Sequence, residues 1–340
     1  NTTGDKNTAL GTGALAANTT AGCNTAVGQA SLCTNTTGCL NTAVGRQALE
    51  VNLTGDNNTG LGYRALNANT SADNNTAVGQ CSMALNTTGT LNVAVGMTAL
   101  KSNTEGSCNT AIGGLALNAN TTGEFNTGVG SCALKVNTTG GASTSVGWQS
   151  MVSNTTGHSS TAMGYRALCA NTTGCYNVAI GREALEKNTT ACHGTSLGYK
   201  ALNSNTEGDR NTALGCGSLL CITTGSSNTG VGADTLDFAT TSTKNTAVGK
   251  GSMTRTTTGS CNTGVGVDTF LHTTTGSCNT AVGNLALAFN TTGANNTAVG
   301  LCSLYDNTTA SENTAIGFKS LVANTTGHSN VAVGCGSLVA

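Results

Sequence analysis

The residues with the clearest chemical potential are asparagines in Asn-x-Thr or Asn-x-Ser sequons, which accept N-linked glycans in a secretory pathway. None has proline at the middle place, and most are followed by Thr-Gly, which is typical of a loop. Three sequons begin at Asn57, Asn74 and Asn295. The main glycosylation candidates are Asn1, Asn18, Asn35, Asn52, Asn69, Asn86, Asn120, Asn137, Asn154, Asn171, Asn188, Asn290, Asn307 and Asn324.

The same Asn-Thr-Thr-Gly segments also suit an unmodified turn, since Asn and Thr side chains bond nearby backbone and Gly accepts a positive φ. The sequon is missing from equivalent segments where Glu105 and Glu207 replace the second Thr. It is also missing at four places where another residue replaces Asn, namely Ile222, Ala239, Thr256 and Thr273. The loop therefore folds without a glycan, and the sequence leaves both readings open.

Fifteen cysteines form the second chemical group, and they favour an oxidising, extracellular or cell-surface setting. If the chain repeats at the spacing of β-strands, equivalent cysteines in adjacent turns lie about 4.8 Å apart, a Cα separation that disulfides accept. The disulfide candidates are two pairs at equivalent positions, Cys175 with Cys192 and Cys261 with Cys278, and one pair of near neighbours across turns, Cys23 with Cys39. A competing scheme closes loops instead, through Cys33 with Cys39 and Cys169 with Cys175.

Other chemistry has little support. His158, Cys175, Cys192 and His193 together offer zinc ligands, but their spacing matches no zinc finger and a disulfide would remove both thiolates. Carboxylates are scattered without a recurring pair, and no phosphate-binding loop motif occurs. We therefore expect no catalytic, cofactor-binding or metal-binding residues. A net charge of −1 and the lack of a long apolar run give no reason to expect nucleic acid or membrane partners.

The element that positions all these residues is a repeat. The motif Asn-Thr-Ala-Val-Gly, or a close variant, begins every 17 residues from Asn7 to Asn330, giving twenty copies without an insertion or deletion. We number each turn from this first residue, so that Asn24 is position 1 and the sequon Asn35 is position 12. Such strict spacing is typical of strands stacked in register, because one extra residue would turn side chains to the wrong face.

The pattern within a turn predicts which positions are inside. Position 4 is always Val, Leu, Ile or Met, position 9 is always Leu, Met or Phe, and position 2 is Thr or Val. We expect positions 2, 4 and 9 to point inward, with the small residues of positions 3 and 8 in a narrow interior or against another chain. The turn then reads as a strand at positions 1–4, a Gly corner at 5–7, a strand at 8–11 and a loop at 12–17. Asn at position 1 is expected to form a stacked amide ladder.

These patterns predict an all-β fold, a parallel β-roll or β-solenoid of twenty 17-residue turns that forms one continuous domain over residues 1–340. At the spacing of strands, it would be a rod about 95 Å long. The absence of proline fits a ladder that uses nearly every backbone N–H. Because Asn1 stands at position 12 and Ala340 at position 11, we expect a segment of a longer fibre.

The N-T-A-V-G-x-x-A-L unit resembles the Ser-Val-Ala-Ile-Gly repeats in the heads of trimeric autotransporter adhesins. It is more similar to the Asn-Thr-Ala-Val-Gly repeats of long surface-fibre and tail-fibre-like proteins. The resemblance covers the whole chain, but the 17-residue period and the added Asn-Thr-Thr-Gly loop differ from the adhesin heads. It implies a projecting fibre or adhesin rather than an enzyme.

Three functions follow as hypotheses. The first is a glycan-coated, non-enzymatic extracellular filament whose partners are copies of itself, joined end to end or side by side. The second is a tail-fibre shaft or a bacterial adhesin head, trimeric and unglycosylated. The third is ice binding, which requires outward threonines on a flat strand face and is disfavoured if position 2 points inward.

Overall fold

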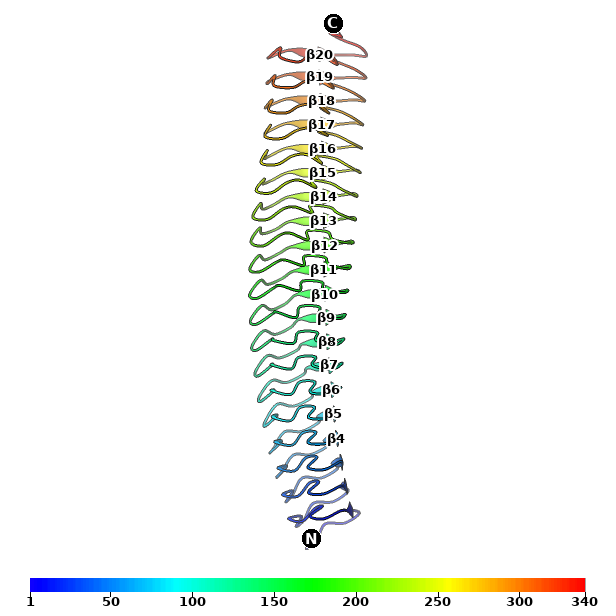
Figure 1. Ribbon diagram of the computed structural model, residues 1–340, viewed down its shortest axis with the longest axis vertical. Helices are drawn as coiled ribbons and strands as arrows, with labels where there is room; N and C mark the ends of the chain where they lie inside the picture. The colour runs from blue at the N-terminus through cyan, green and yellow to red at the C-terminus, as the bar shows by residue number, and fades with distance from the viewer. Residues whose placement is uncertain (340) are drawn as a thin grey trace. The chain divides into compact units, whose positions relative to one another are not determined.

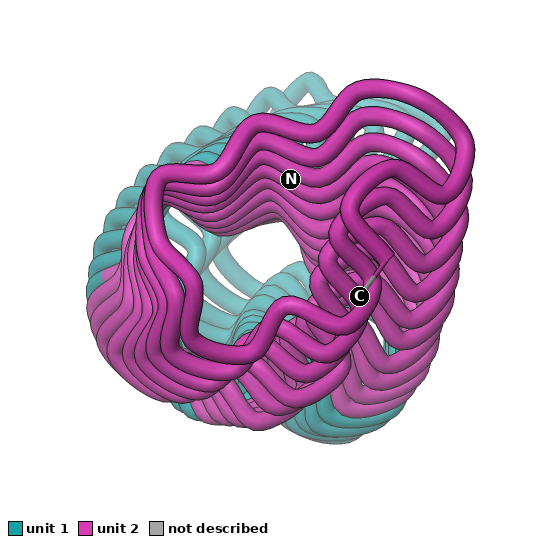
Figure 2. The backbone as a smooth tube through the Cα atoms, turned by 90° about the horizontal axis from the view of Figure 1, so that it is seen from above, with its two compact units in different colours: residues 1–173 teal, residues 174–340 magenta. Residues whose placement is uncertain are grey.

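The computed structural model describes residues 1–339, and Ala340 lies outside the described residues. The fold is all-β, and no helix occurs in the described residues. Each turn contributes one strand of three residues at positions 2–4, and successive strands are parallel. The prediction of a parallel β-solenoid with 17-residue turns is therefore confirmed. The contacts divide the chain into two compact units, residues 1–173 and 174–340 (Figure 2).

Unit 1 stacks its strands in sequence order, each paired with the same positions of the next turn, as Thr25, Ala26 and Val27 pair with Thr42, Ala43 and Val44. Figure 1 shows these strands above one another. They are β1 (Thr8–Leu10), β2 (Thr25–Val27), β3 (Thr42–Val44), β4 (Thr59–Leu61), β5 (Thr76–Val78), β6 (Val93–Val95), β7 (Thr110–Ile112), β8 (Thr127–Val129), β9 (Thr144–Val146) and β10 (Thr161–Met163).

Unit 2 repeats the arrangement, for example with Thr246, Ala247 and Val248 paired to Thr263, Gly264 and Val265. Its strands are β11 (Val178–Ile180), β12 (Thr195–Leu197), β13 (Thr212–Leu214), β14 (Thr229–Val231), β15 (Thr246–Val248), β16 (Thr263–Val265), β17 (Thr280–Val282), β18 (Thr297–Val299), β19 (Thr314–Ile316) and β20 (Val331–Val333). The offset of 17 residues holds in every strand pair described within the two units.

The strand faces are the reverse of the expectation. In β3 the middle residue Ala43 is fully buried, whereas Thr42 is half-buried and Val44 is 38 % exposed. Side chains alternate along a strand, so only position 3 can face the interior while positions 2 and 4 face outward. The inward placement of positions 2 and 4 was therefore wrong. Positions 3 and 8 line the narrow interior, which was one of the two readings offered for the small residues.

The second expected strand, at positions 8–11, does not form. Positions 7 and 9 have positive φ in nearly every turn, as at Gln47 (φ 58°) and Leu49 (φ 51°). This left-handed conformation breaks the alternation of a strand, so that Ala48 and Leu49, adjacent in sequence, are both fully buried. Position 9 thus faces inward as predicted, but on a coiled backbone. The Leu49 N–H still donates to the carbonyl of Ala65 in the next turn, at 2.9 Å.

The backbone of each turn is bonded mainly to its neighbours. The N–H of Thr42 donates to the backbone carbonyl of Asn58 in the following turn. The N–H of Gly45 donates to the backbone carbonyl of Val27 in the preceding turn. Gly45 has φ 132°, and a Cβ there would meet the Gly62 carbonyl oxygen at 2.6 Å. Both the positive φ and the close approach of the next turn require glycine at position 5. The absence of proline fits this dense use of donors.

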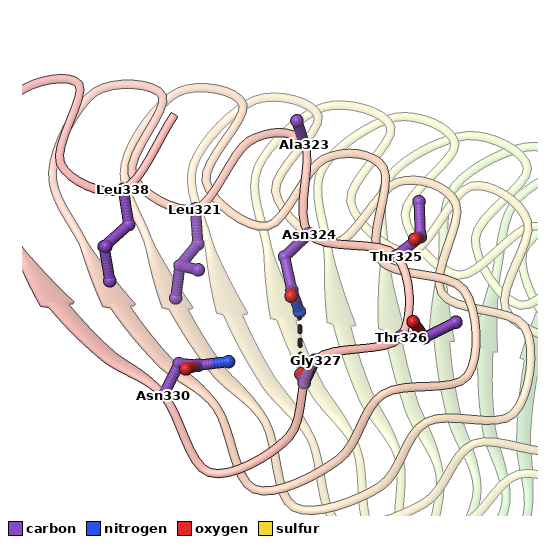
Figure 3. A pocket seen from close by; sticks show the side chains of 8 residues that line it. All are labelled: Leu321, Ala323, Asn324, Thr325, Thr326, Gly327, Asn330 and Leu338. Atoms are coloured by element: carbon purple, nitrogen blue, oxygen red, sulfur yellow. Dashed lines mark hydrogen bonds between the residues drawn. The ribbon is translucent and has the colours of Figure 1, made fainter. Parts of the chain in front are cut away.

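The core of each turn is small and partly polar. Leucine or another large apolar residue at position 9 is its main apolar side chain, since Leu49, Leu117 and Phe270 are fully buried. Burial of each such side chain contributes roughly 1.5–3 kcal/mol. Figure 3 shows the last turns, where Leu321 and Leu338 lie in successive turns beside Asn324. Leu321 is buried, whereas Leu338 is 56 % exposed.

Candidate functional site

The sequon asparagines at position 12 form a buried amide ladder. Asn120 is fully buried, and its Nδ2 donates to Asn103 Oδ1 at 2.9 Å and to the Gly123 carbonyl at 3.0 Å. Its Oδ1 accepts from Asn137 Nδ2 at 2.9 Å. The same bond to the carbonyl of position 15 is drawn for Asn324 in Figure 3. The side chains of this column therefore hold the loop closed and join it to the neighbouring turns.

This geometry bears directly on the expected stripe of glycans. An N-glycan is attached through Nδ2, and that atom is buried and donates two hydrogen bonds in most of the column. Asn18, Asn35, Asn52, Asn69, Asn86, Asn120, Asn137, Asn154, Asn171, Asn188, Asn290 and Asn307 are all buried, whereas Asn1 is exposed and Asn324 is half-buried. A glycan on the buried members does not fit the folded turn. The turn-forming interpretation of Asn-Thr-Thr-Gly is the one that agrees with the structure.

The three remaining sequons have the opposite environment. Asn57, Asn74 and Asn295 stand at position 17, are exposed, and have φ values of 58°, 61° and 57°. The sequence analysis noted them as further sequons and did not count them among the main glycosylation candidates. The signal that could have ranked them first is the variability of position 17, which holds residues from Lys6 to Phe125 across the turns.

The asparagines at position 1 form a second column of a different kind. The Oδ1 of Asn41 accepts the backbone N–H of Asn58, one turn later, at 2.9 Å, and Asn41 Nδ2 donates to the Gly55 carbonyl at 2.8 Å. Direct amide-to-amide bonds occur in part of the column, as from Asn92 Nδ2 to Asn75 Oδ1 at 3.2 Å. The predicted link along the stack is present, but it passes mainly through the backbone.

None of the expected disulfides is formed among the described residues. The Cys175 N–H donates to Cys192 Sγ at 3.1 Å, and the Gly22 N–H points to Cys39 Sγ at 3.4 Å. Position 16 therefore uses a side-chain acceptor to bond the preceding turn, a role that Asp56 fills for the Cys39 N–H at 2.7 Å. In-register side chains also keep the rung spacing of about 4.8 Å, wider than the roughly 3.8 Å between the Cβ atoms of a disulfide. This accounts for the in-register pairs Cys175 with Cys192 and Cys261 with Cys278, whereas Cys23 and Cys39 stand at different positions, 17 and 16, of adjacent turns.

Titratable groups do not gather into a reactive cluster in the part of the chain that the structure describes, and no set of three metal-ligating side chains occurs there. An ion pair joins Arg182 Nε to Glu183 Oε1 at 3.0 Å, with Lys200 Nζ 3.5 Å from Oε2. Desolvation would raise the pKa of the Glu183 carboxyl, but Arg182 and Lys200 outweigh it and hold that pKa below its usual value. Burial, together with Asp234, raises the pKa of Asp237.

Two shallow hollows lie on the surface. One, of about 380 Å³ in unit 1, is lined by Glu124, Phe125 and His158 where Gly141 leaves side-chain space between turns. The other, of about 430 Å³ in unit 2, is lined by Phe238, Arg255, Thr257 and Thr274. Both hollows are lined by a phenylalanine and by threonines, but Glu124 and His158 occur only in the first and Arg255 only in the second, so they do not define one chemistry.

The outward strand face is a regular apolar surface of the chain. Position 4 is apolar in all twenty turns, and Val44, Val95 and Ile112 are 38 %, 37 % and 41 % exposed. Position 2 adds threonines whose hydroxyls make no hydrogen bond within the described residues. Neither position carries a charge in any turn. We call positions 2 and 4 together the strand face.

The chain was compared with known proteins, and neither a family model nor a curated protein sequence matches it. Within the described residues no helix has the length and apolarity needed to cross a membrane.

Proposed function

We propose that the chain is a segment of a structural filament. It is a non-enzymatic fibre element that adds length to the filament and presents a regular surface. The observation that carries this proposal is the repetition of the same strand pairing, turn after turn, within each unit, with the position-12 ladder beside it throughout unit 1. Asn120 is bonded to Asn103 and Asn137 as Asn52 is bonded to Asn35 and Asn69. Interactions of this kind continue in one direction and add stability with each turn. A cell-surface or particle-surface setting is proposed because the repeat resembles those of surface and tail fibres.

The length of the particle provides the test. A duplication of residues 41–125, which adds five whole turns, is expected to lengthen the particle by roughly 24 Å without changing its width. Electron microscopy of the purified variant beside the original chain measures both dimensions. Insertion of one glycine after Thr42 is the matched control, because it shifts the register of one strand and should disrupt the stack there. A duplication that widens the particle or collapses it into compact globules would refute the proposal.

The buried position-12 column favours an unglycosylated fibre, such as a tail-fibre shaft or an adhesin head, over a glycan-coated one. We propose that position 17 is the only recurring place where a folded turn accepts an N-glycan. Expression through a secretory pathway, followed by peptide mapping, is expected to find glycan at Asn57, Asn74 or Asn295 and none at Asn120. A glycan on Asn120 in folded, soluble protein would contradict this assignment.

A further inference from the structure

Position 4 of the strand face is half-exposed, yet it is apolar in every turn. The preference of residues for β-strands does not explain this. Position 4 is Leu or Met in five turns, and these residues are not β-branched. It is never Thr, although Thr forms strands well and fills position 2 beside it. What the twenty turns keep at position 4 is apolar character, not a preference for the strand conformation.

Other exposed positions do not keep any such character. Position 11, on the coiled side of the turn, holds Val51, Lys187, Arg255 and Asp306 among others. Val51 and Val44 belong to the same turn and are equally exposed, at 38 %. Position 4 excludes polar residues throughout the chain, whereas position 11 accepts them. Solvent exposure by itself therefore does not explain why only position 4 stays apolar.

The exposed apolar area of the strand face is similar to the area that one partner buries in a protein–protein interface. Ten half-exposed aliphatic side chains in a column present on the order of 500 Å², near the upper limit for an apolar patch on a monomer. With the methyl groups of position 2, a single unit approaches the roughly 800 Å² that each partner buries in a standard interface. Figure 1 shows the strands that carry this surface stacked in succession within each unit.

We propose that the strand face binds the strand face of a second copy of this chain, so that filaments associate side by side. This inference rests on the proposed filament and names its partner. A second copy is the occupant that repeats at the same rung spacing, so its position-4 side chains can match the column turn for turn. Because positions 2 and 4 carry no charge, two such faces meet without repulsion. The inward position 2 that would disfavour ice binding is not found, since its threonines point outward. An ice surface nevertheless suits this face less well, because position 4 changes from Val95 to Ile112 to Met163 and breaks a regular lattice.

The test compares two double variants in unit 1. Val44→Lys/Val95→Lys places charges on the strand face, whereas Val51→Lys/Val136→Lys places them at position 11. The four valines are 36–38 % exposed, so the two variants are matched in chemistry and exposure. Sedimentation at micromolar concentration is expected to give the original chain a mass that is a multiple of 33.5 kDa. The strand-face variant should raise the dissociation constant at least tenfold, and the control should stay within twofold.

A further variant distinguishes weaker association from misfolding of the lysine variant. Val44→Thr/Val95→Thr keeps the side-chain shape and the β-branching while it removes apolar surface, so it should also weaken association with unchanged circular dichroism. Equal effects of the strand-face and position-11 variants, or a chain that is monomeric at tens of micromolar, would overturn the proposal. So would a monomeric chain that inhibits ice growth and loses this activity in Val44→Lys/Val95→Lys, because the occupant would then be ice. In each of these outcomes, particle length can still follow the number of turns, so the filament proposal is judged separately.

Discussion

Replacement of Asn120 by alanine tests whether the position-12 ladder holds the turns together. The substitution removes three hydrogen bonds, two donated by Nδ2 and one accepted by Oδ1. At about 1 kcal/mol each, these bonds account for about 3 kcal/mol. Asn103 Oδ1 also loses the Asn120 donor inside the core, which adds about 1–2 kcal/mol. We expect a total loss of about 4–5 kcal/mol.

Urea unfolding followed by circular dichroism measures this loss, and hydrogen exchange shows whether it is centred on the turns around Asn120. Thr122→Ala is the matched control, because Thr122 lies in the same loop and is exposed, so its replacement should change stability by less than about 0.5 kcal/mol. Asn120→Ala with a loss below about 1 kcal/mol would refute the reasoning, since the ladder would then contribute no more than an exposed polar contact.

Three further outcomes are expected. Thr273→Asn should stabilise the chain by about 1–3 kcal/mol, as measured by urea unfolding. The change replaces a buried hydroxyl that has no hydrogen-bond partner in the described residues, and it offers an acceptor to Asn290 Nδ2. No gain in stability would contradict an extension of the position-12 ladder to this turn. Thr98→Gly should raise the free energy of unfolding, measured in urea, by about 1 kcal/mol, since a β-branched residue is strained at φ 53°. Asp237 has a raised pKa, so its folded form holds a proton more tightly than the unfolded chain, and stability should fall as pH rises from about 4 through that pKa. Asp237→Asn should flatten this dependence, by less than about 1 kcal/mol because the group is partly exposed, and an unchanged pH profile would count against it.

Much of the fold could be predicted because the repeat is strict. The period, the parallel register and the strand at positions 2–4 all follow from side chains that recur every 17 residues. The error at positions 8–11 arose because a strand was assumed, whereas the positive φ of residues such as Leu49 is invisible to a pattern of residue types. Two adjacent restricted positions, 8 and 9, were the available sign that alternation fails there. The strand face was misassigned because a constant apolar residue was equated with a buried one.

The candidate site was predictable in position but not in role. The Asn-Thr-Thr-Gly segments were correctly identified as loops, yet the sequence does not reveal which way an amide points. Asn120 and Asn57 both begin sequons, but one is buried and the other is exposed. That distinction depends on the path of the backbone around the turn. It can be recovered from the sequence only by comparing how freely each position varies among the twenty copies.

The bonds between turns also determine how each unit responds to force. They run along the stack, so a pull on the two ends of a unit opens them one turn at a time instead of shearing many strands at once. A released turn of 17 residues can extend to about 58 Å, where it had occupied a rung of roughly 4.8 Å. When the hydrogen bonds that hold one turn to its neighbour break, the chain can therefore lengthen by about 50 Å. Under tension, such a filament would yield in equal steps and absorb mechanical work before its covalent chain is loaded.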